Sequence, residues 1–161
     1  MKLNLGCGKD LLPGYINIDI DSNLELVRVG DVRDLSDFDD GSMEVVRATD
    51  IIEHFELDEV GNILTEWIRV LEPGGSLYIR CPDIVAIVAC FYPEARAGGM
   101  EWSKLSEMIH GHCDKYNRHR VTFAFEWLKK LLDERGMIHI KHAGCSNQNM
   151  IVTALKRENA P

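Results

Sequence analysis

The sequence predicts an α/β protein with a mostly parallel β-sheet, and three observations support this fold class. The chain has 161 residues, of which 45% are hydrophobic and 27% charged, so it is long enough for one domain with a real core. Short segments rich in Val, Ile and Leu alternate with amphipathic helical segments, as in α/β folds. Two glycines follow the first apolar segment, and an aspartate follows the second. The sequence therefore predicts a single domain over residues 1–161, with a ligand site at one edge of its sheet.

Seven segments are expected to form strands. Their content of Val, Ile and Leu is typical of strands that are buried in a mostly parallel sheet. The expected strands are Lys2–Leu5, Tyr15–Ile20, Leu26–Val29, Met43–Ala48, Ser76–Cys81, Met137–Ala143 and Asn149–Leu155.

Four segments are expected to form helices. In the first, an apolar stripe recurs at helical spacing, and Pro73-Gly74-Gly75 follows as a stop signal. In the last, Gly136 supplies the C-terminal stop. The expected helices are Asp58–Leu71, Ile84–Phe91, Trp102–His110 and Phe125–Arg135.

The connection between the first two strands is unusually short. Only nine residues separate Leu5 from Tyr15, and Pro13 and Gly14 are among them. A parallel crossover normally needs about a dozen residues or more and contains a helix. We therefore expect the first crossover helix to be a single turn or missing, which would leave the ligand cleft open on that side.

Composition limits the classes of partner. The formal net charge of −8 repels phosphate backbones, which weighs against nucleic acid as the main substrate. No apolar run approaches the ~20 residues that span a bilayer, and the first residues form a strand rather than a signal sequence. The five cysteines include no Cys-x-x-Cys pair, so neither a disulfide framework nor a zinc knuckle is expected. These features predict a cytoplasmic protein without a membrane segment.

The segment after the first strand predicts a nucleoside site. Gly6 and Gly8 can adopt positive φ and leave no Cβ near a ligand, and Asp19 ends the next strand. Glycines beside the ligand and a carboxylate on the ribose hydroxyls form the usual arrangement. A nicotinamide dinucleotide fits poorly, because its motif needs a third glycine where this chain has Leu11. A nicotinamide-dependent oxidoreductase remains the weaker alternative.

The order of motifs resembles that of a class I S-adenosylmethionine-dependent methyltransferase of the small, stand-alone kind. Leu3-Asn4-Leu5-Gly6-Cys7-Gly8 resembles the first glycine motif of that family, and Asp19 matches its ribose-binding acid. Further matching segments are 30–35, 40–46, 50–55, 70–77 and 125–136 with the two terminal strands. The resemblance implies a Rossmann-like three-layer sandwich, with a seven-stranded sheet whose last strand is antiparallel. It also implies S-adenosylmethionine as cofactor and S-adenosylhomocysteine as product.

The resemblance implies a set of cofactor-binding residues. Asp19 would bind the ribose, although Asp21 competes for that role. Asp31 would accept from the adenine amino group, with a turn cap as the alternative role for its carboxylate. The complete set is Asn4, Gly6, Cys7, Gly8, Asp19, Ile20, Asp31, Val32, Asp50 and Ile51.

Three residues are candidates for catalysis: His54, His119 and Tyr116. His54 follows the fourth strand, where the reactive methyl group would lie, and its imidazole suits a general base. The alternative is that Glu53 and His54 start and cap the next helix. A base is needed only if the acceptor loses a proton. No metal site is predicted, because the motif His110-x-His112-Cys113 has no partner cluster at a zinc-site spacing.

The region between residues 92 and 120 matches no general pattern, and the resemblance places substrate contacts there. The main hypothesis is therefore a methyltransferase that acts on an unidentified small polar acceptor. The alternative is a non-catalytic, cofactor-binding subunit that needs a partner protein for its substrate site. A homodimer that buries residues 84–110 would favour the self-contained enzyme.

Overall fold

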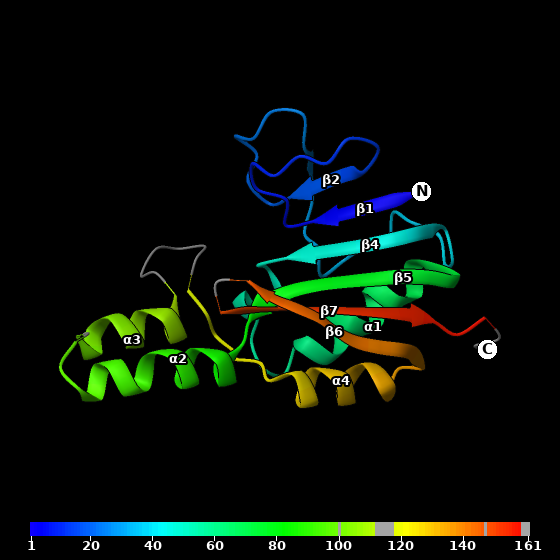
Figure 1. Ribbon diagram of the computed structural model, residues 1–161. Coiled ribbons are helices and arrows are strands. Elements are labelled where there is room, and N and C mark those ends of the chain that lie inside the picture. Colours follow the sequence, from blue (N-terminus) through cyan, green and yellow to red (C-terminus); the bar gives the residue numbers. More distant parts are fainter. Residues whose placement is uncertain (100, 112–117, 147, 159–161) are drawn as a thin grey trace.

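The computed structural model describes residues 1–99, 101–111, 118–146 and 148–158, and it contains one seven-stranded sheet. Its order is β3-β2-β1-β4-β5-β7-β6 (Figure 1). The strands are β1 (Lys2–Leu5), β2 (Ile16–Asp19), β3 (Arg28–Val29), β4 (Met43–Thr49), β5 (Leu71–Pro82), β6 (Met137–Ser146) and β7 (Asn149–Lys156).

The pairing confirms the expected topology. β1 pairs in parallel with β2 and β4, and β3 and β5 extend the parallel arrangement on either side. β7 is antiparallel to both of its neighbours, β5 and β6. The Rossmann-like α/β fold with an antiparallel last strand is therefore confirmed. Because β1 is central, the residues that follow it and those that follow β4 meet at the same edge of the sheet.

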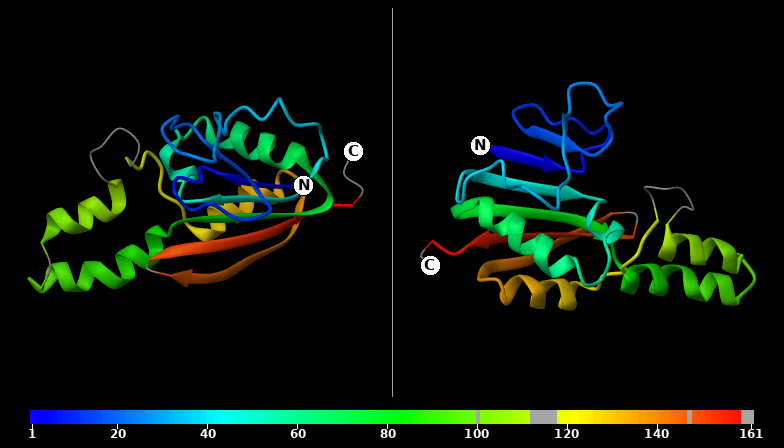
Figure 2. Two further views of the ribbon diagram at one scale, coloured as in Figure 1. Left: turned by 90° about the horizontal axis from the view of Figure 1, so that it is seen from above. Right: turned by 180° about the vertical axis from the view of Figure 1, so that it is seen from behind.

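Helices α1 (Val60–Val70) and α4 (Phe125–Asp133) lie on the same face of the sheet (Figure 2). The burial of β5 alternates because the helices cover one face of the sheet. Leu77, Ile79 and Cys81 on the covered face are at most 1% exposed, whereas the residues between them on the other face are partly exposed. The core is thus built between the sheet and these two helices, with Trp67 of α1 as its largest fully buried side chain. The described part of the chain places no helix over the opposite face, where the expected three-layer arrangement would have its third layer.

Loops held by side chains replace the helices of the early crossovers. Residues 6–15, 20–27 and 30–42, all of them described, contain turns and no helix, which confirms the shortened first crossover. The buried Asn4 donates from Nδ2 to Asp10 O (2.8 Å) and to Asn17 Oδ1 (2.9 Å). Asn17 in turn bonds both the N–H and the carbonyl oxygen of Leu12. These bonds satisfy backbone groups that a helix would otherwise pair.

The two largest differences from the expected boundaries lie in β5 and α2. β5 begins at Leu71, so Pro73-Gly74-Gly75 lies within the strand as an irregularity rather than as a turn after the helix. Gly75 is required there, because a Cβ would lie 2.8 Å from Glu72 O. Helix α2 (Ile84–Arg96) continues through Pro93 for a last turn, where a proline removes only one helical hydrogen bond.

Helix α3 (Trp102–His110) packs on α2, and the pair projects away from the sheet (Figure 1). Its bounds agree with the sequence prediction. A small separate cluster of Ile87, Ala95 and Leu105 holds the two helices together. Among the described residues, no helix is long and apolar enough to cross a membrane.

Candidate functional site

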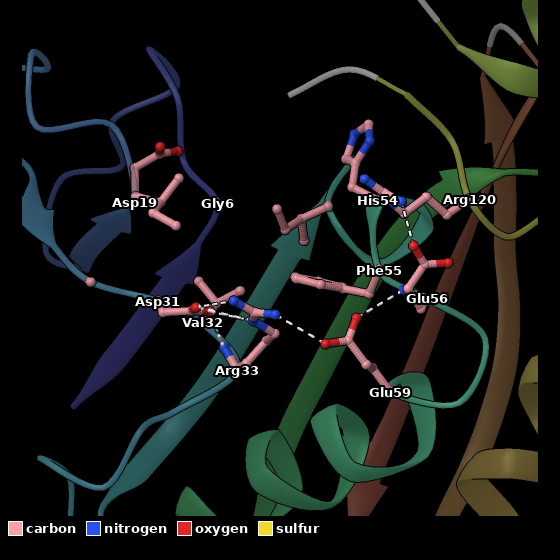
Figure 3. A pocket seen from close by; sticks show the side chains of 13 residues that line it. Gly6, Asp19, Asp31, Val32, Arg33, His54, Phe55, Glu56, Glu59 and Arg120 are labelled. Atoms are coloured by element: carbon pink, nitrogen blue, oxygen red, sulfur yellow. Dashed lines mark hydrogen bonds and ion pairs between the residues drawn. The ribbon is translucent and has the colours of Figure 1, made fainter. Parts of the chain in front are cut away.

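The carboxyl ends of β1, β2 and β4 border a continuous cleft, as expected for a parallel sheet. Two adjoining cavities of about 350 and 700 Å³ form it. Both are lined by Gly6, Asp19, Ile20, Ile51, His54, Phe55 and Arg120. In Figure 3, Asp19 and Asp31 lie on one side of the cleft, and His54 and Arg120 lie on the other. The cleft is large enough for a nucleoside-sized ligand.

The glycine turn is shaped by positive φ angles and by the end of β4. Gly6 has φ +61°, and a Cβ on it would lie 2.7–2.9 Å from three side-chain atoms of Ile51. Gly8 has φ +50°, but a Cβ there would meet no atom within 4 Å. Gly6 therefore serves internal packing, whereas Gly8 leaves space on the side of the cleft.

Asp19 links the glycine turn to the end of β2. Its Oδ2 accepts from the N–H of Gly8 at 2.8 Å, and its Oδ1 accepts from the N–H of Asp21 at 3.0 Å. Each carboxylate oxygen has a second lone pair, which can accept from a ribose hydroxyl. The competing Asp21 instead bonds the backbone and side chain of Asn23, and these bonds lower its pKa. The geometry thus favours Asp19 for the ribose.

Asp31 lies in a network of charges on the same side of the cleft as Asp19. Its carboxylate forms a forked ion pair with Arg33 at 2.6–3.0 Å, and Arg33 also bonds Glu59 at 3.0 Å (Figure 3). The Arg33 guanidinium holds the pKa of Asp31 below its usual range. Asp31 Oδ1 also accepts from the N–H of Arg33, which is the alternative turn-capping role. The adjacent Val32 is buried, and its carbonyl oxygen accepts from the indole N–H of Trp67.

Asp50 ends β4 in an unusual conformation. Its φ of +52° lies in the left-handed region, which few residues other than glycine adopt. Its carboxylate pairs with the guanidinium of Arg80 and accepts from Asn149 Nδ2 at 3.3 Å. Ile51 follows and forms part of the cleft wall, so the strained residue turns the chain from the strand into the cleft.

Asn4 and Cys7 line the larger of the two cavities. Asn4 borders the cleft, while its amide makes the two loop-holding bonds described above. Cys7 is 6% exposed, and burial together with the nearby Asp19 charge raises the pKa of its thiol to about 11. Cys7 is therefore protonated at neutral pH and has little nucleophilic character.

Two of the three predicted catalytic residues come together beside the cleft, which His54 lines. The rings of His54 and His119 have centroids 5.3 Å apart, inclined by 56°. Nδ1 of His54 lies 3.1 Å from Arg118 O, and Nδ1 of His119 lies 3.3 Å from Ile109 O. Tyr116 lies outside the described residues.

The other acceptor candidates in this region are separated from the pair. His112, Cys113 and Asn117 lie outside the described residues. His110 is exposed and lines a different cavity, next to α3.

Glu53 is a site residue that the sequence does not single out as functional. It lies in a short 3-10 helix, η1 (Ile52–His54), and is 1% exposed. Burial is the main reason that the pKa of its carboxyl is raised to about 8. The expected alternative, that Glu53 and His54 start and cap the next helix, is met in part: both lie in η1, but the N-cap of η1 is Ile51, and the longer helix α1 begins only at Val60 after an N-cap at Glu59. The signal in the sequence was their position directly after β4.

Comparison with known families supports the resemblance. The family model "Methyltransferase domain" matches residues 3–79, which include β1 to β4, η1, α1 and most of β5. A search of curated protein sequences finds no match.

Solved structures share the fold over nearly the whole chain. A SAM-dependent methyltransferase from Archaeoglobus fulgidus matches with a TM-score of 0.68 and 15% identity, covering 96% of this chain and 85% of that one. One from Methanosarcina mazei matches with a TM-score of 0.67 and 18% identity, covering 98% and 92%. A methyltransferase from Haloferax volcanii, in complex with the Trm112 methyltransferase activator, matches with a TM-score of 0.60 and 14% identity, covering 99% and 83%. The solved structures show the Rossmann-like fold of S-adenosylmethionine-dependent methyltransferases, and the family-model match over residues 3–79 supports the assignment of this chain to class I of those enzymes.

Proposed function

We propose that this chain transfers a methyl group from S-adenosylmethionine to a small polar acceptor that binds beside His54 and His119. The observation that carries the proposal is the continuity of the cleft. One cleft joins the glycine turn and Asp19, which fit the donor, to His54, which fits a polar acceptor and whose ring lies against that of His119. Transfer requires this arrangement, since donor and acceptor must meet within one enclosed space.

Several residues at one end of the cleft support binding of the cofactor there. The space beside Gly8 admits the amino-acid part of the donor, and Asp19 retains lone pairs for the ribose hydroxyls. We propose that Asp31 and Val32 bind the adenine edge, with the half-exposed Ile20 and Ile51 packing on the rings. Asn4, Cys7 and Asp50 complete the donor site as wall residues.

At the acceptor end, the residues of this chain orient the nucleophile and take up its proton. When bound, the donor would supply an electrophilic methyl group on a sulfonium, which an acceptor lone pair would attack in line, with the C–S bond breaking and S-adenosylhomocysteine as the leaving group. A carbonyl oxygen only accepts, so the Nδ1 atoms that face Arg118 O and Ile109 O carry protons and the basic lone pair lies on Nε2. We propose that this basic nitrogen accepts the acceptor's proton and releases it to water. Tyr116 is proposed as a further contact of the acceptor.

Titration calorimetry with S-adenosylhomocysteine tests the donor site. We expect saturable binding, and no heat at about 0.5 mM ligand would contradict the proposal. Mass-spectrometric screening of sugars, hydroxy acids and amines for a gain of one methyl group would then identify the acceptor.

A second candidate function, a cofactor-binding subunit that needs a partner, is favoured by the projecting helices. Val85, Val88, Tyr92 and Trp102 are 42–57% exposed, so α2 and α3 present an apolar surface. The Haloferax volcanii neighbour was solved together with an activator protein. Light scattering after size exclusion separates the alternatives: a homodimer that buries residues 84–110 favours the self-contained enzyme, and a monomer that self-associates nonspecifically favours a missing partner.

A further inference from the structure

We propose that Glu53, His54 and His119 bind one divalent transition-metal cation at the acceptor end of the cleft. One ligand atom from each of the three side chains lies within 4.8 Å of the others. Metal–nitrogen bonds of about 2.0–2.1 Å in a tetrahedral site place neighbouring ligand atoms about 3.4 Å apart. Small side-chain rotations therefore suffice to bring the three atoms onto one ion.

The buried carboxylate of Glu53 is the strongest observation in favour of a cation site. Its Oε2 is buried and has no hydrogen-bond partner among the residues that the structure describes. Buried polar atoms are nearly always paired, because an unpaired one loses its hydration without compensation. The charge of Asp50 raises the pKa of Glu53 and the charge of Arg80 lowers it. Asp50 and Arg80 form an ion pair with each other. A metal ion between Glu53 and the imidazoles would satisfy this oxygen.

The backbone holds the imidazoles in the orientation that metal ligands adopt. Ligating histidines usually donate their second ring N–H to a backbone carbonyl or a carboxylate, which fixes the tautomer. Here Nδ1 of His54 faces Arg118 O at 3.1 Å, and Nδ1 of His119 faces Ile109 O at 3.3 Å. Both rings therefore have the tautomer whose Nε2 carries the coordinating lone pair.

Backbone hydrogen bonds also join the two segments that supply the ligands. The carbonyl oxygen of Glu53 accepts from the N–H of Arg120 at 2.8 Å and from the N–H of Val121 at 3.3 Å. The N–H of His119 donates to His110 O at 2.8 Å. The cluster is thus assembled by the fold, which brings His119 to the adjacent residues Glu53 and His54.

The donor set indicates the class of ion. Two imidazoles and one carboxylate suit Zn²⁺, Co²⁺ or Fe²⁺, whereas Mg²⁺ and Ca²⁺ prefer oxygen ligands throughout. Three protein ligands leave at least one position open on a four-coordinate ion. Because His54 also lines the cleft, we infer that an acceptor oxygen occupies that position. The ion would lower the pKa of the bound hydroxyl, and while it occupies the imidazole lone pairs the proton would pass directly to water, which replaces the imidazole route described above.

The role in catalysis rests on the proposed function, but binding of the ion does not, so the test omits the methyl donor. Protein stripped with a chelator is titrated with Zn²⁺ by calorimetry and with Co²⁺ by visible absorption. We expect one ion per chain and weakening of at least tenfold in Glu53→Gln, His54→Gln and His119→Gln. His142→Gln, which removes an exposed histidine of β6, is the matched control and should bind as the wild type does. Mg²⁺ should not compete at equal concentration.

Several results would overturn the proposal. Absence of stoichiometric binding would do so, as would binding that Glu53→Gln leaves unchanged. Loss of binding only in His112→Gln or Cys113→Ser would place the ion at the His110–Cys113 motif instead. Circular dichroism melts of each variant in chelator control for folding, and Zn²⁺ should raise the melting temperature of the wild type but not of Glu53→Gln. Since donor binding is measured separately, either result can fail without the other.

Discussion

The side chain of Ile51 occupies the space in which a side chain on Gly6 would lie. The distance from an ideal Gly6 Cβ to Ile51 Cγ1 would be 2.7 Å, which is far inside normal contact. The first turn after β1 is thus fitted against the residue that follows the strained Asp50 at the end of β4. This contact joins the donor-binding turn to the wall from which the acceptor-side residues extend.

Substitution of the two glycines should separate stability from donor binding. Gly6→Ala adds a clash with Ile51 to the cost of a positive φ, so it should lower the free energy of unfolding by about 2–4 kcal/mol. Gly8→Ala meets no atom and should cost about 1 kcal/mol, but its methyl group points into open space of the donor site. Urea denaturation measures the first effect, and calorimetry with S-adenosylhomocysteine measures the second.

The two variants control for each other. Gly8→Ala should lose more donor affinity per unit of lost stability than Gly6→Ala. If both variants lost the same free energy of unfolding, the clash with Ile51 would contribute nothing to the loss in Gly6→Ala.

Asp19→Asn should weaken binding of S-adenosylhomocysteine by about 1.5–3 kcal/mol, which is about 10- to 100-fold. The amide loses the charge and one accepting atom, while the shape of the side chain is kept. Asp21→Asn is the matched control, because its carboxylate faces Asn23 and should matter by less than about 0.5 kcal/mol. A larger loss for Asp21→Asn than for Asp19→Asn would assign the ribose to Asp21. Calorimetry at fixed salt measures both.

The Cys7 thiol should be almost unreactive at pH 8. With a pKa raised to about 11, only about 0.1% of it is thiolate at that pH, and its alkylation rate should rise with pH until the pH passes about 11. Peptide-level mass spectrometry after iodoacetamide pulses measures the rate, with the exposed Cys90 as internal reference.

Burial is the largest cause of the shift in Cys7, and the charge of Asp19 is the next. Asp19→Asn should therefore accelerate labelling of Cys7 at pH 8 without changing that of Cys90. Labelling of Cys7 as fast as Cys90 in the wild-type protein would contradict the buried, protonated thiol.

Asn17→Ala should lower the free energy of unfolding by about 2–4 kcal/mol, because it leaves the N–H of Leu12 unpaired and removes one of the two bonds to the Leu12 carbonyl oxygen and one bond of Asn4. Asn4→Ala should cost a similar amount. Since the two side chains share one network, the double variant should lose less than the sum of the single losses, by about 0.5–3 kcal/mol. The exposed Asn23→Ala is the control and should stay within about 0.5 kcal/mol. Additive losses in urea denaturation would show that the two side chains act independently.

Most of the fold could be predicted from the sequence, because its signals are local. Apolar strands, the stripe of α1 and the bounds of α3 depend on neighbouring residues. The glycine turn and Asp19 could likewise be placed, since each follows a strand directly. The start of β5 was missed, because Pro73-Gly74-Gly75 is a stop signal by composition and is accommodated only through its contacts with β4.

The acceptor side could be predicted only in part. His54 and His119 were each candidates, but nothing local shows that their rings meet, since the contact depends on backbone bonds between η1 and residues 118–121. Glu53 lies beside His54 in the sequence, yet its burial results from tertiary packing. The pairing of Arg33 with Glu59 was missed for the same reason, because Glu59 is the N-cap of α1 and that helix must first be positioned.

The replacement of early crossover helices by side-chain-held loops has a thermodynamic consequence. Asn4 and Asn17 brace the loop that forms the donor site, so the free energy that holds this loop is also part of the binding free energy of the donor. By linkage, a saturating donor stabilises the folded chain by RT ln(1 + [L]/Kd), and a loosened loop raises the apparent Kd without any change in a contacting residue. At one donor concentration, the melting temperatures of variants in this loop should therefore rise by less than that of the wild type, whereas variants between α4 and the sheet should show the full wild-type increment.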